Sequence, residues 1–595
     1  MNDKPDPTQT LQEALAEHQA GRLAGAEEMY RAILDADQNH ADARHLLALV
    51  AFQEGRLDEA LAGIDLAIEK NAGVAMFHSN RGKILKSMDR NEDAAEAFGA
   101  GLRLAPGHPE TLSDLAGAMI GTEDYDAALN FSSRAIALSP KLAPAHFNRG
   151  LASAAMGALP DAKISFQATL DIDPAFAPAR FEMGKICHDE GDLDAAERHY
   201  DQAIRNDPTM SEALVNLANV QRASQRLEEA VENYLLALEM IGDVAIVHGN
   251  LGVALHELGD IDGALVAYER ALEIESGDSE VRRNRAQALL QLGRFEEGWR
   301  EFEWRWKTRH FAAIRRTWNM PQWDGTPLDG GTVLIHAEQG FGDCLQFIRF
   351  APLVRKRVAR VIVECPAPTA GLVSRVVGVD DVVPAGAPLP EVDAHIPMMS
   401  LPGVFGVDLE TLPAEVPYLS VADQDRRTWA GRIGPGERLR VGVVWKGSHK
   451  HQRNTWRSPG IDALSPLFGV ADINFISLQK DDEAADIKAA GLREDVLRLG
   501  HEFRDFSETA AVVDNLDLII TPDTAVAHLA GGMGKPVWVM LPHVSEWRWL
   551  MDRDDSPWYP TMKLFRQDRR GDWSAPVAQM ALELRDLAAG FTSSS

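Results

Sequence analysis

Small and apolar residues recur along the first half of the chain at a fixed interval of 34 residues. A small residue follows each turn position by five residues, and an aromatic ring usually follows it by nine. Because small residues let helices approach closely and rings fill the space between them, the pattern predicts stacked helical pairs. The turn positions are Gly21, Gly55, Asp89, Glu123, Gly157, Gly191, Gln225, Gly259 and Gly293; the small residues are Ala26, Ala60, Ala94, Ala128, Ala162, Ala196, Ala230, Ala264 and Gly298. The rings are Tyr30, Phe98, Phe166, Tyr200, Tyr234, Tyr268 and Phe302.

The second helix of several units is predicted to end at a proline 17 residues after the turn, because proline cannot continue a helix. This pattern resembles the tetratricopeptide repeat, with about nine units over residues 11–310. The resemblance implies an all-α solenoid that acts as a scaffold, so any chemistry is expected after residue 310. The prolines are Pro106, Pro140, Pro174 and Pro208.

A different pattern begins after the repeats, in which short runs rich in valine and isoleucine alternate with helical stretches such as 344–357 and 508–515. Such runs are typical of strands buried on both faces of a parallel sheet. We therefore expect two doubly wound α/β domains, separated by the Pro-, Gly- and Asp-rich passage 384–418, with ligands at the carboxyl ends of the strands. The expected strands are 333–337, 360–364, 440–445, 474–479, 516–521 and 536–541, and the expected domains are 1–310, 311–430 and 431–595.

The first candidate site follows the strand at 333–337, where Gly340, Gly342 and Asp343 precede a helix. Glycines at such a turn allow a ligand to approach the backbone, and Asp343 is expected to face the cleft. The alternative is that Asp343 only caps the helix. His336, at the end of the strand, faces the same cleft and is the reserve candidate for a catalytic base.

The second candidate site follows the strand at 516–521, where Asp523 and Thr524 open a helix that also carries His528. The free amides of a helix start form a site for anions such as phosphate. His528 lies one turn after Thr524, so both could reach one phosphate. The alternative is a capped helix with His528 in the core.

A third candidate is a cluster of positive residues after the strand at 440–445, suited to a diphosphate or a carboxylated sugar. A solvated basic loop is the alternative. We assign Lys446, Gly447 and Arg457 from this cluster to the donor site, together with Gln479 at the end of the next strand. The cluster comprises Lys446, Gly447, Ser448, His449, Lys450, His451, Arg453 and Arg457.

Asparagines recur on the predicted first helices of the repeats, although asparagine is a poor helix former. A ladder of side-chain amides could pair with the backbone of an extended acceptor peptide. The alternative is that they pack beside the neighbouring helix. The segment at 216–219 resembles the asparagine ladder of O-GlcNAc transferase, although Asp114 and Glu182 interrupt the series. The assigned residues are Asn80, Asn148, Asn216, Asn219, Asn250 and Asn284.

Charge and composition narrow the possible partners. Residues 1–310 carry 22 of the 29 net negative charges, which argues against nucleic acid as their ligand. Three cysteines form neither a disulfide framework nor a metal-binding spacing, and no apolar run is long enough for a membrane span. We therefore expect a cytoplasmic protein that binds neither nucleic acid nor membranes.

The motifs around Asp343 and at 521–536 resemble the heptosyltransferase-type glycosyltransferases of the two-domain GT-B fold, over residues 330–545. The resemblance implies that Asp343 is the general base and that Asp523, Thr524 and His528 hold the phosphates of a nucleotide-sugar donor, with Arg457 as a basic donor residue. No metal or cofactor is expected. Asp552 and Asp554 form an acid-x-acid motif, but a loop salt bridge is the favoured interpretation.

The whole architecture resembles bacterial proteins that join such repeats to a transferase domain, among them soluble flagellin O-glycosyltransferases. The resemblance implies transfer of a nonulosonic acid, such as pseudaminic or legionaminic acid, to Ser or Thr of flagellin. Two alternatives are a non-catalytic scaffold with a degenerate transferase domain and a transferase acting on lipid or polysaccharide.

Two aromatic clusters lie at the edges of this region. Trp304, Trp306, Trp318 and Trp323 are expected to cap the solenoid and attach it to the next domain. In the segment 547–560, which departs from the heptosyltransferase pattern, the aromatic residues are expected to form core or, alternatively, to stack on a sugar. These are Trp547, Trp549, Trp558 and Tyr559.

Overall fold

The computed structural model describes residues 7–434, 436–447, 457–481, 483–492 and 496–592. The chain divides into two compact units, Met1–Gly242 and Asp243–Ser595, and each is described by itself. Among the described residues, no helix combines the length and the apolar character needed to cross a bilayer.

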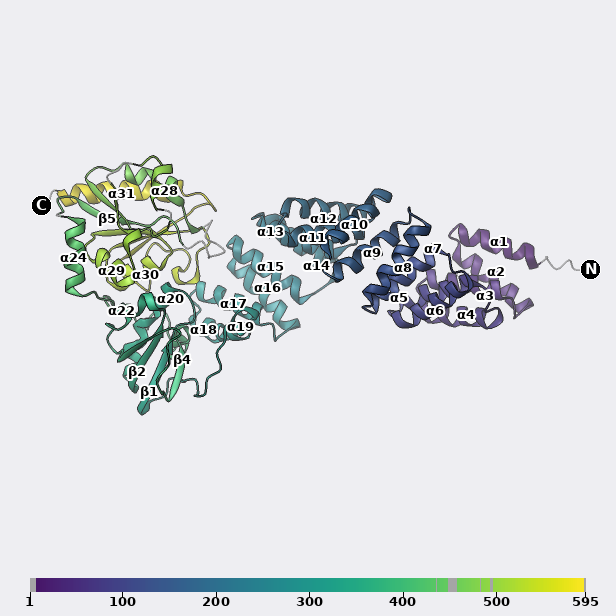
Figure 1. Ribbon diagram of the computed structural model, residues 1–595, viewed down its shortest axis with the longest axis horizontal. Helices are drawn as coiled ribbons and strands as arrows, with labels where there is room; N and C mark the ends of the chain where they lie inside the picture. Colours follow the sequence, from purple (N-terminus) through teal and green to yellow (C-terminus); the bar gives the residue numbers. More distant parts are fainter. Residues whose placement is uncertain (1–6, 435, 448–456, 482, 493–495, 593–595) are drawn as a thin grey trace, which may run out of the picture. The chain divides into compact units, whose positions relative to one another are not determined.

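The first unit is a series of antiparallel helix pairs (Figure 1). Each predicted turn position of the repeat lies between the two helices of a pair, as in Gly21 between α1 and α2. The helices are α1 (Pro7–Gln19), α2 (Leu23–Ala36), α3 (Ala41–Gln53), α4 (Leu57–Lys70), α5 (Ala75–Ser87), α6 (Asn91–Leu104), α7 (Pro109–Gly121), α8 (Tyr125–Leu138), α9 (Ala143–Ala155), α10 (Leu159–Ile172), α11 (Ala177–Asp189), α12 (Leu193–Asn206), α13 (Ser211–Ala223) and α14 (Leu227–Ile241).

The backbone explains the 34-residue register. All nine turn positions have a positive φ, between 56° at Asp89 and 103° at Gly259. Glycine adopts this left-handed conformation without steric cost, whereas other residues pay about 1–2 kcal/mol. The predominance of glycine at these positions therefore follows from the turn itself.

The packing inside each pair explains the ring positions. Ala26 and its equivalents are fully buried, and so are Phe98, Phe166, Tyr200 and Tyr268. Opposite each of these four rings lies a glycine on the first helix of the same pair, where an added Cβ would come within 2.4–2.6 Å of the ring. The glycines are Gly82, Gly150, Gly184 and Gly252.

The second unit begins with the last repeats and not at residue 311. Its first helices are packed on the α/β region: the Gln291 amide donates to the Ser545 carbonyl oxygen at 2.8 Å, and the Trp299 indole donates to the Val407 carbonyl oxygen at 3.1 Å. These elements are α15 (Ala245–Leu258), α16 (Ile261–Ile274), α17 (Ser279–Gln291), α18 (Phe295–Phe302), η1 (Glu303–Lys307) and α19 (Arg309–Ile314).

The α/β region of the second unit contains two parallel sheets, as predicted. The described strands follow the order β3-β2-β1-β4 in one sheet and β10-β9-β8-β5-β6-β7 in the other. The strands are β1 (Leu328–His336), β2 (Val358–Cys365), β3 (Asp381–Pro384), β4 (Ala394–Pro397), β5 (Leu439–Val443), β6 (Ile473–Ser477), β7 (Leu497–Arg498), β8 (Leu518–Pro522), β9 (Val537–Leu541) and β10 (Met562–Arg566).

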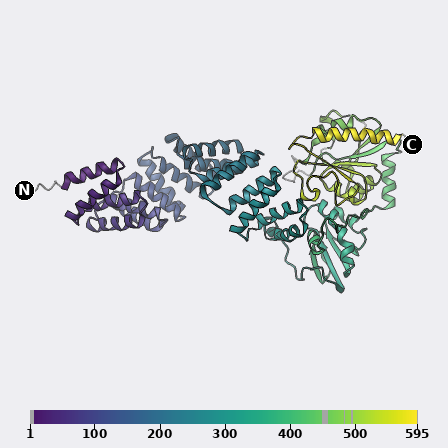
Figure 2. The same cartoon turned by 180° about the vertical axis from the view of Figure 1, so that it is seen from behind.

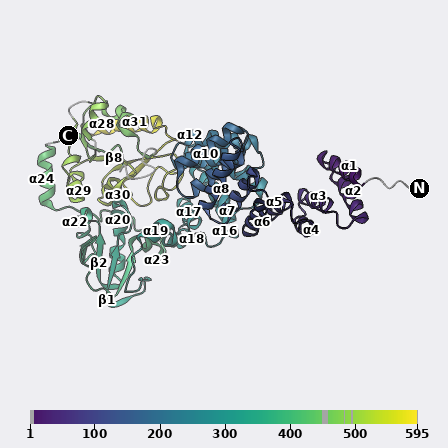
Figure 3. The same cartoon turned by 45° about the vertical axis from the view of Figure 1, so that its right-hand side comes forward.

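Short helices connect the strands and cover the sheets. The longest, α31 (yellow in Figure 2), packs its apolar side on one face of the second sheet, whereas α29 and α30 (labelled in Figure 1) belong to the core on the other face. Helix α24 lies beside α29 (Figures 1 and 3). The elements are α20 (Phe341–Phe347), η2 (Ile348–Phe350), α21 (Ala351–Arg355), η3 (Ala367–Thr369), α22 (Ala370–Val373), η4 (Met398–Ser400), α23 (Leu401–Val404), α24 (Asp423–Ile433), α26 (Gly460–Ala463), α27 (Ser465–Phe468), α28 (Glu483–Ala489), η5 (Gly500–Glu502), α29 (Phe506–Asp514), α30 (Ala525–Gly532), η6 (Trp547–Trp549) and α31 (Ser574–Thr592).

Two predictions about this region need correction. The helix expected at 344–357 begins at Phe341 and is broken by η2 ahead of Pro352, which lacks the N–H that an uninterrupted helix would need. The passage 384–418 is not only a separator, because it contributes β4, which pairs with β1. Four residues are too short a run to stand out in the sequence.

The packing of a glycine against a ring can be tested in the first unit. In Gly82→Ala the new Cβ would lie 2.6 Å from the fully buried Phe98 ring, so we expect a loss of about 1–3 kcal/mol. Gly99→Ala is the matched control, because its Cβ would have Arg103 Nη1 as nearest neighbour at 3.8 Å, and a helical alanine should be slightly stabilising. Thermal unfolding of the full chain measures both. Equal melting temperatures for the two variants would contradict this account of the ring positions.

Candidate functional site

Asp343 lies in the first turn of α20, directly after the carboxyl end of β1. Its Oδ2 accepts a hydrogen bond from the Gly340 N–H at 2.9 Å, so the residue does cap the helix. Its Oδ1 accepts a hydrogen bond from the Arg548 guanidinium, and 20% of the side chain remains exposed. The structure thus combines the capping role with a second, charged contact.

Asp523 and Thr524 lie directly after β8, where α30 begins. The Thr524 hydroxyl is 2.9 Å from the Thr521 hydroxyl. Asp523 is 13% exposed and faces two basic side chains: Arg457 Nη1 at 3.9 Å from Oδ2, and His528 Nε2 at 3.8 Å from Oδ1. Arg457, Asp523 and Thr524 are therefore brought to one place, as the sequence predicts.

His528 is buried, as in the alternative interpretation of this helix. Its Nδ1 is 3.0 Å from the Tyr559 hydroxyl, and its ring stacks on Trp549 with centroids 5.5 Å apart. Burial lowers the pKa of His528 to about 3, against the opposing effect of Asp523. The imidazole is therefore neutral at pH 7, so it does not supply a positive charge for a phosphate.

The two motifs meet through Gly342. A Cβ added to Gly342 would lie 2.9 Å from His528 Cδ2 and 3.6 Å from Ala525 Cα. Helices α20 and α30 are therefore in direct contact at their first turns. The sequence predicts that Gly342 lets a ligand approach the backbone. In the structure, its lack of a side chain instead allows α20 and α30 to approach each other.

Arg548 contacts the first motif, and no pattern in the sequence singles it out. Its guanidinium donates to Asp343, to Glu546 and, through Nε, to Gln346 Oε1 at 2.5 Å. Although burial opposes the charge, the Glu546 and Asp343 carboxylates raise the pKa of Arg548 above its ordinary value. The only signal in the sequence is its place between two tryptophans in a segment that departs from the heptosyltransferase pattern.

Most of the third candidate cluster, Ser448–Arg453, lies outside the described residues. Of its neighbours, the Lys446 ammonium is 2.7 Å from an Asp486 oxygen, and the Gly447 N–H donates to Ser458 Oγ at 3.0 Å. Gln479 Oε1 accepts from the backbone N–H of Trp445 at 3.2 Å and of Lys446 at 3.1 Å. Gln479 therefore holds the segment that follows β5. A donor bound by Lys446 and Gln479 would have to compete with these contacts inside the protein.

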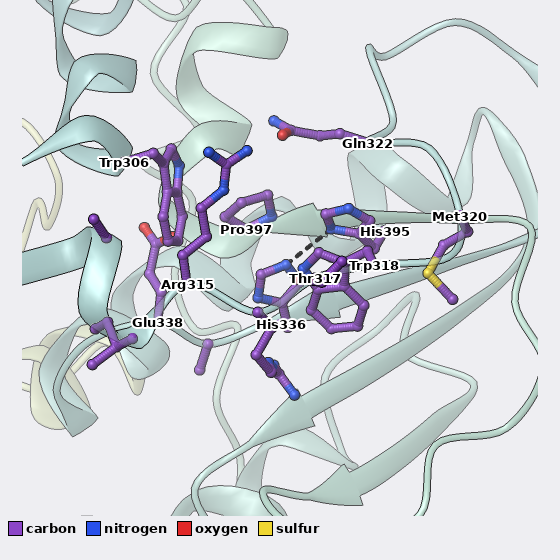
Figure 4. Close-up of a pocket in the computed structure, with 14 residues that line it drawn as sticks. Trp306, Arg315, Thr317, Trp318, Met320, Gln322, His336, Glu338, His395 and Pro397 are labelled. Atoms are coloured by element: carbon purple, nitrogen blue, oxygen red, sulfur yellow. Dashed lines mark hydrogen bonds between the residues drawn. The ribbon is translucent and has the colours of Figure 1, made fainter.

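His336 lines a hollow of about 670 Å³ at the carboxyl ends of β1 and β4. Its Nε2 is 3.1 Å from His395 Nδ1, and both imidazoles pack on Trp318, with centroids 4.7 and 4.4 Å from it (Figure 4). Burial lowers the pKa of His336 to about 3. The lining residues are Trp306, Ala312, Ile314, Arg315, Arg316, Thr317, Trp318, Met320, Gln322, His336, Ala337, Glu338, His395 and Pro397.

Glu338 joins this hollow to the Asp343 loop. Both of its oxygens accept from Arg305 Nη2, at 2.9 and 3.1 Å, and Arg305 is completely buried. Burial raises the pKa of Glu338 to about 7, although Arg305 acts in the opposite direction. Arg305 belongs to η1, so the segment after the last repeat is anchored to the loop that carries Asp343.

The junction tryptophans have different roles. Trp299 and Trp323 are buried, and Trp299 packs edge-to-face on Trp547 at 5.2 Å. Trp304 lies under Arg282 and Lys307, while Trp306 and Trp318 line the hollow. Beyond the sheets, the rings of Trp547, Trp549, Trp558 and Tyr559 are buried, as the preferred interpretation states.

The assigned asparagines lie on the first helices of their pairs and are half-buried. The amide of Asn148 donates to the Ser113 carbonyl oxygen at 2.8 Å, and that of Asn80 is 2.7 Å from His45 Nε2. Asn219 Oδ1 accepts from the Tyr234 hydroxyl at 2.6 Å, and its amide is 3.5 Å from Asn216 Oδ1. At Asn80 and Asn148 the structure therefore agrees with the packing alternative; Asn250 and Asn284 are placed in the same series.

The loop that carries the Asp552–Asp554 motif also contains an ion pair. Arg553 pairs with Asp555 at 2.6 Å beside the Asp552–Asp554 motif, so a loop salt bridge is present there. In the part of the chain that the structure describes, no three His, Cys, Asp or Glu side chains are grouped so as to hold a metal ion.

Comparisons with known proteins identify the repeats. Tetratricopeptide-repeat models match residues 17–84, 177–210, 209–276 and 255–298. Among curated proteins, Protein FlbA of Caulobacter vibrioides is 26% identical over 386 residues, which is 59% of this chain. The match spans 63% of the length of that relative.

Solved tetratricopeptide-repeat proteins are similar to parts of the chain. A protein of this kind from Parabacteroides merdae ATCC 43184 is 15% identical, with 42% of this chain and 98% of the other covered and a TM-score of 0.36. YrrB, a tetratricopeptide-repeat protein with an unusual peptide-binding site, is 23% identical, with 31% and 95% covered and a TM-score of 0.26.

Because His336 is neutral in the folded protein, we predict that the free energy of unfolding depends on pH in the acid range. Below pH 6.5 the unfolded chain protonates this histidine, whereas the fold keeps it neutral down to about pH 3, so stability falls as the pH falls through this range. We expect His336→Gln to remove about 2 kcal/mol of the stability difference between pH 7 and pH 4.5. Denaturant unfolding at both pH values measures it, with exposed His310→Gln as the control. An unchanged pH dependence in His336→Gln would contradict the assignment.

The fold and the comparisons together give a firm identification for the first half of the chain only. The helical pairs over residues 10–310 form a tetratricopeptide-repeat solenoid, followed by a region of parallel sheets.

Proposed function

We propose that this protein is a glycosyltransferase of the two-domain GT-B type, which transfers a sugar from a nucleotide donor to Ser or Thr of an acceptor protein. The observation that carries the proposal is the contact between the first turns of α20 and α30. At this contact Gly342, which precedes Asp343 in one α/β half, lies against Ala525, which follows Asp523 and Thr524 in the other.

The strand order supports this location. In an open parallel sheet, ligands bind where the strand order reverses. The first sheet reverses between β1 and β4, and the second between β5 and β8. Asp343 follows β1, while Lys446 and Asp523 follow β5 and β8, so both reversal points carry residues that the sequence assigns to the site.

The proposed chemistry is a direct displacement. Asp343 takes the proton from the acceptor hydroxyl as its oxygen forms a bond to the anomeric carbon, and the bond from that carbon to the donor phosphate oxygen breaks. The first amides of α30 and the Arg457 guanidinium stabilise the departing phosphate. The neutral His528 supports α30 from the core and carries no charge in this step.

The acceptor and the sugar are proposed from the sequence resemblance. The repeats hold flagellin, and the sugar is a nonulosonic acid such as pseudaminic or legionaminic acid. The anchoring of η1 on Glu338 connects the last repeat to the Asp343 loop, which suits an acceptor that is held by the repeats and modified at the sheets.

One observation favours the non-catalytic scaffold as a second candidate. Both Asp343 oxygens already accept hydrogen bonds, from Gly340 and Arg548. Capping and pairing could be the whole role of Asp343 in a scaffold, whereas in an enzyme the carboxylate would accept the proton at one of its remaining lone pairs, of which a carboxylate has about four in all. The two candidates differ in what an Asp343 variant does to sugar transfer.

We predict that Asp343→Asn lowers the rate of transfer to purified flagellin by about 10²–10⁴-fold, because asparagine keeps the shape but cannot accept the proton. Flagellin binding should be unchanged. Asp554→Asn is the control, since Asp554 is exposed on a loop. Intact-mass analysis of flagellin over time measures the rate. Equal rates for Asp343→Asn and the wild type would exclude Asp343 as the base.

The repeats supply a separate prediction about acceptor binding. Asn216→Ala on α13 should weaken the binding of flagellin by about 5–10-fold, because a side-chain amide that pairs with the acceptor backbone is lost. Asn130→Ala is the matched control, on the exposed side of the second helix α8. Calorimetric titration measures both, with melting temperatures to verify folding. Equal affinity for the two variants would favour the packing role of the asparagines.

A further inference from the structure

Arg548 is placed unlike the other buried arginine between the two halves. Arg349 donates to the carbonyl oxygens of Gln346, Pro413 and Trp558 and to the Tyr418 hydroxyl, so its partners are uncharged. Arg548 donates to two carboxylates, Asp343 and Glu546. An arginine that only held the two halves together would not need two carboxylate partners.

The guanidinium is held in one orientation. Its Nε donates to Gln346 Oε1 on α20, and its plane lies over Trp547 at 4.5 Å and Phe347 at 5.5 Å. Trp547 packs in turn on Trp299 at 5.2 Å. The fork of Arg548 therefore presents one fixed N–H to Asp343 Oδ1.

Asp343 is fixed at both oxygens as a result. Oδ2 accepts from its own helix at Gly340, and Oδ1 accepts from Arg548 on the segment after β9. The cluster of Arg548, Asp343 and Glu546 holds one positive and two negative charges. Glu546 shares the Arg548 cation with Asp343, and 20% of the Asp343 side chain is still exposed.

We propose that Arg548 is a positioning residue that orients the Asp343 carboxylate for proton transfer, with Glu546 as the group that balances its charge. The inference rests on the proposed function and adds a residue to it. Arg548 does not touch the reacting atoms; it acts through Asp343. Its effect must therefore disappear when Asp343 can no longer accept a proton.

The test is a double-mutant cycle on sugar transfer to flagellin. We expect Arg548→Gln to lower kcat by at least 10-fold, while KM for flagellin changes less than threefold, since orientation and not binding is lost. Arg548→Lys should recover part of the rate, because an ammonium keeps the charge but not the fork. In the Asp343→Asn background, Arg548→Gln should cause no further loss.

The controls separate positioning from folding. Arg553→Gln is matched, since Arg553 lies in the same segment and pairs with Asp555, away from Asp343. Arg548→Gln leaves Glu546 without its ionic partner, so this variant could unfold. Glu546→Gln/Arg548→Gln removes both charges together and tests the inference in that case. Melting temperatures identify any variant whose loss reflects unfolding.

Three results would overturn the inference. One is a kcat for Arg548→Gln equal to that of Arg553→Gln, and another is a loss that adds fully to that of Asp343→Asn. The third is a normal rate of sugar transfer by Glu546→Gln/Arg548→Gln, provided that this variant is folded. If the wild-type protein transfers no sugar from any donor, the proposed function itself fails. If the wild type and Arg548→Gln are both fully active, the function stands and only the inference about Arg548 fails.

Discussion

The second unit depends on a close contact between two helices, which is possible because Gly342 has no side chain. A Cβ on residue 342 would come within 2.9 Å of His528 Cδ2, so a side chain there would push the first turns of α20 and α30 apart. Burial in this contact keeps His528 neutral, since protonation would place a charge in the core. Every proposed role of Asp343, Asp523 and Thr524 requires this contact.

The segment after β9 secures the same contact from the other side. It stacks Trp549 on His528, places the Tyr559 hydroxyl on the His528 Nδ1 and brings Arg548 to Asp343. Its Ser545 carbonyl oxygen also accepts from Gln291 on α17. One stretch of chain thus joins the last repeat and both α/β halves, which belong to the same compact unit.

The sequence was sufficient to predict the repeats, because their periodicity reflects local geometry: a left-handed turn and a ring packed inside each helix pair. Six of the ten described strands, β1, β2, β5, β6, β8 and β9, were predicted for a similar reason, since each contains a continuous apolar run. Strands β3, β4 and β7 were missed because they have only two to four residues, and β10 was missed because Lys563 interrupts its apolar residues.

Contacts between residues distant in the sequence could be predicted less well. Motif spacing placed Asp343, Asp523 and Thr524 at strand ends, but no pattern pairs Asp343 with Arg548, 205 residues later. Gln479 and Lys446 follow strand ends, as residues of a donor site would, but in the structure Gln479 bonds to the backbone of Trp445 and Lys446 pairs with Asp486. Similarly, His336 lies at a strand end as expected, but packing with His395 and Trp318 makes it a buried, neutral group.

If the two motifs form one site for sugar transfer to a protein, the mass of the acceptor depends on this chain. The decisive measurement is the intact mass of flagellin from cells that carry the protein and from cells that lack it. We expect flagellin from the first cells to be heavier by one or more nonulosonic acid residues. Equal masses in the two samples would show that the protein does not modify flagellin.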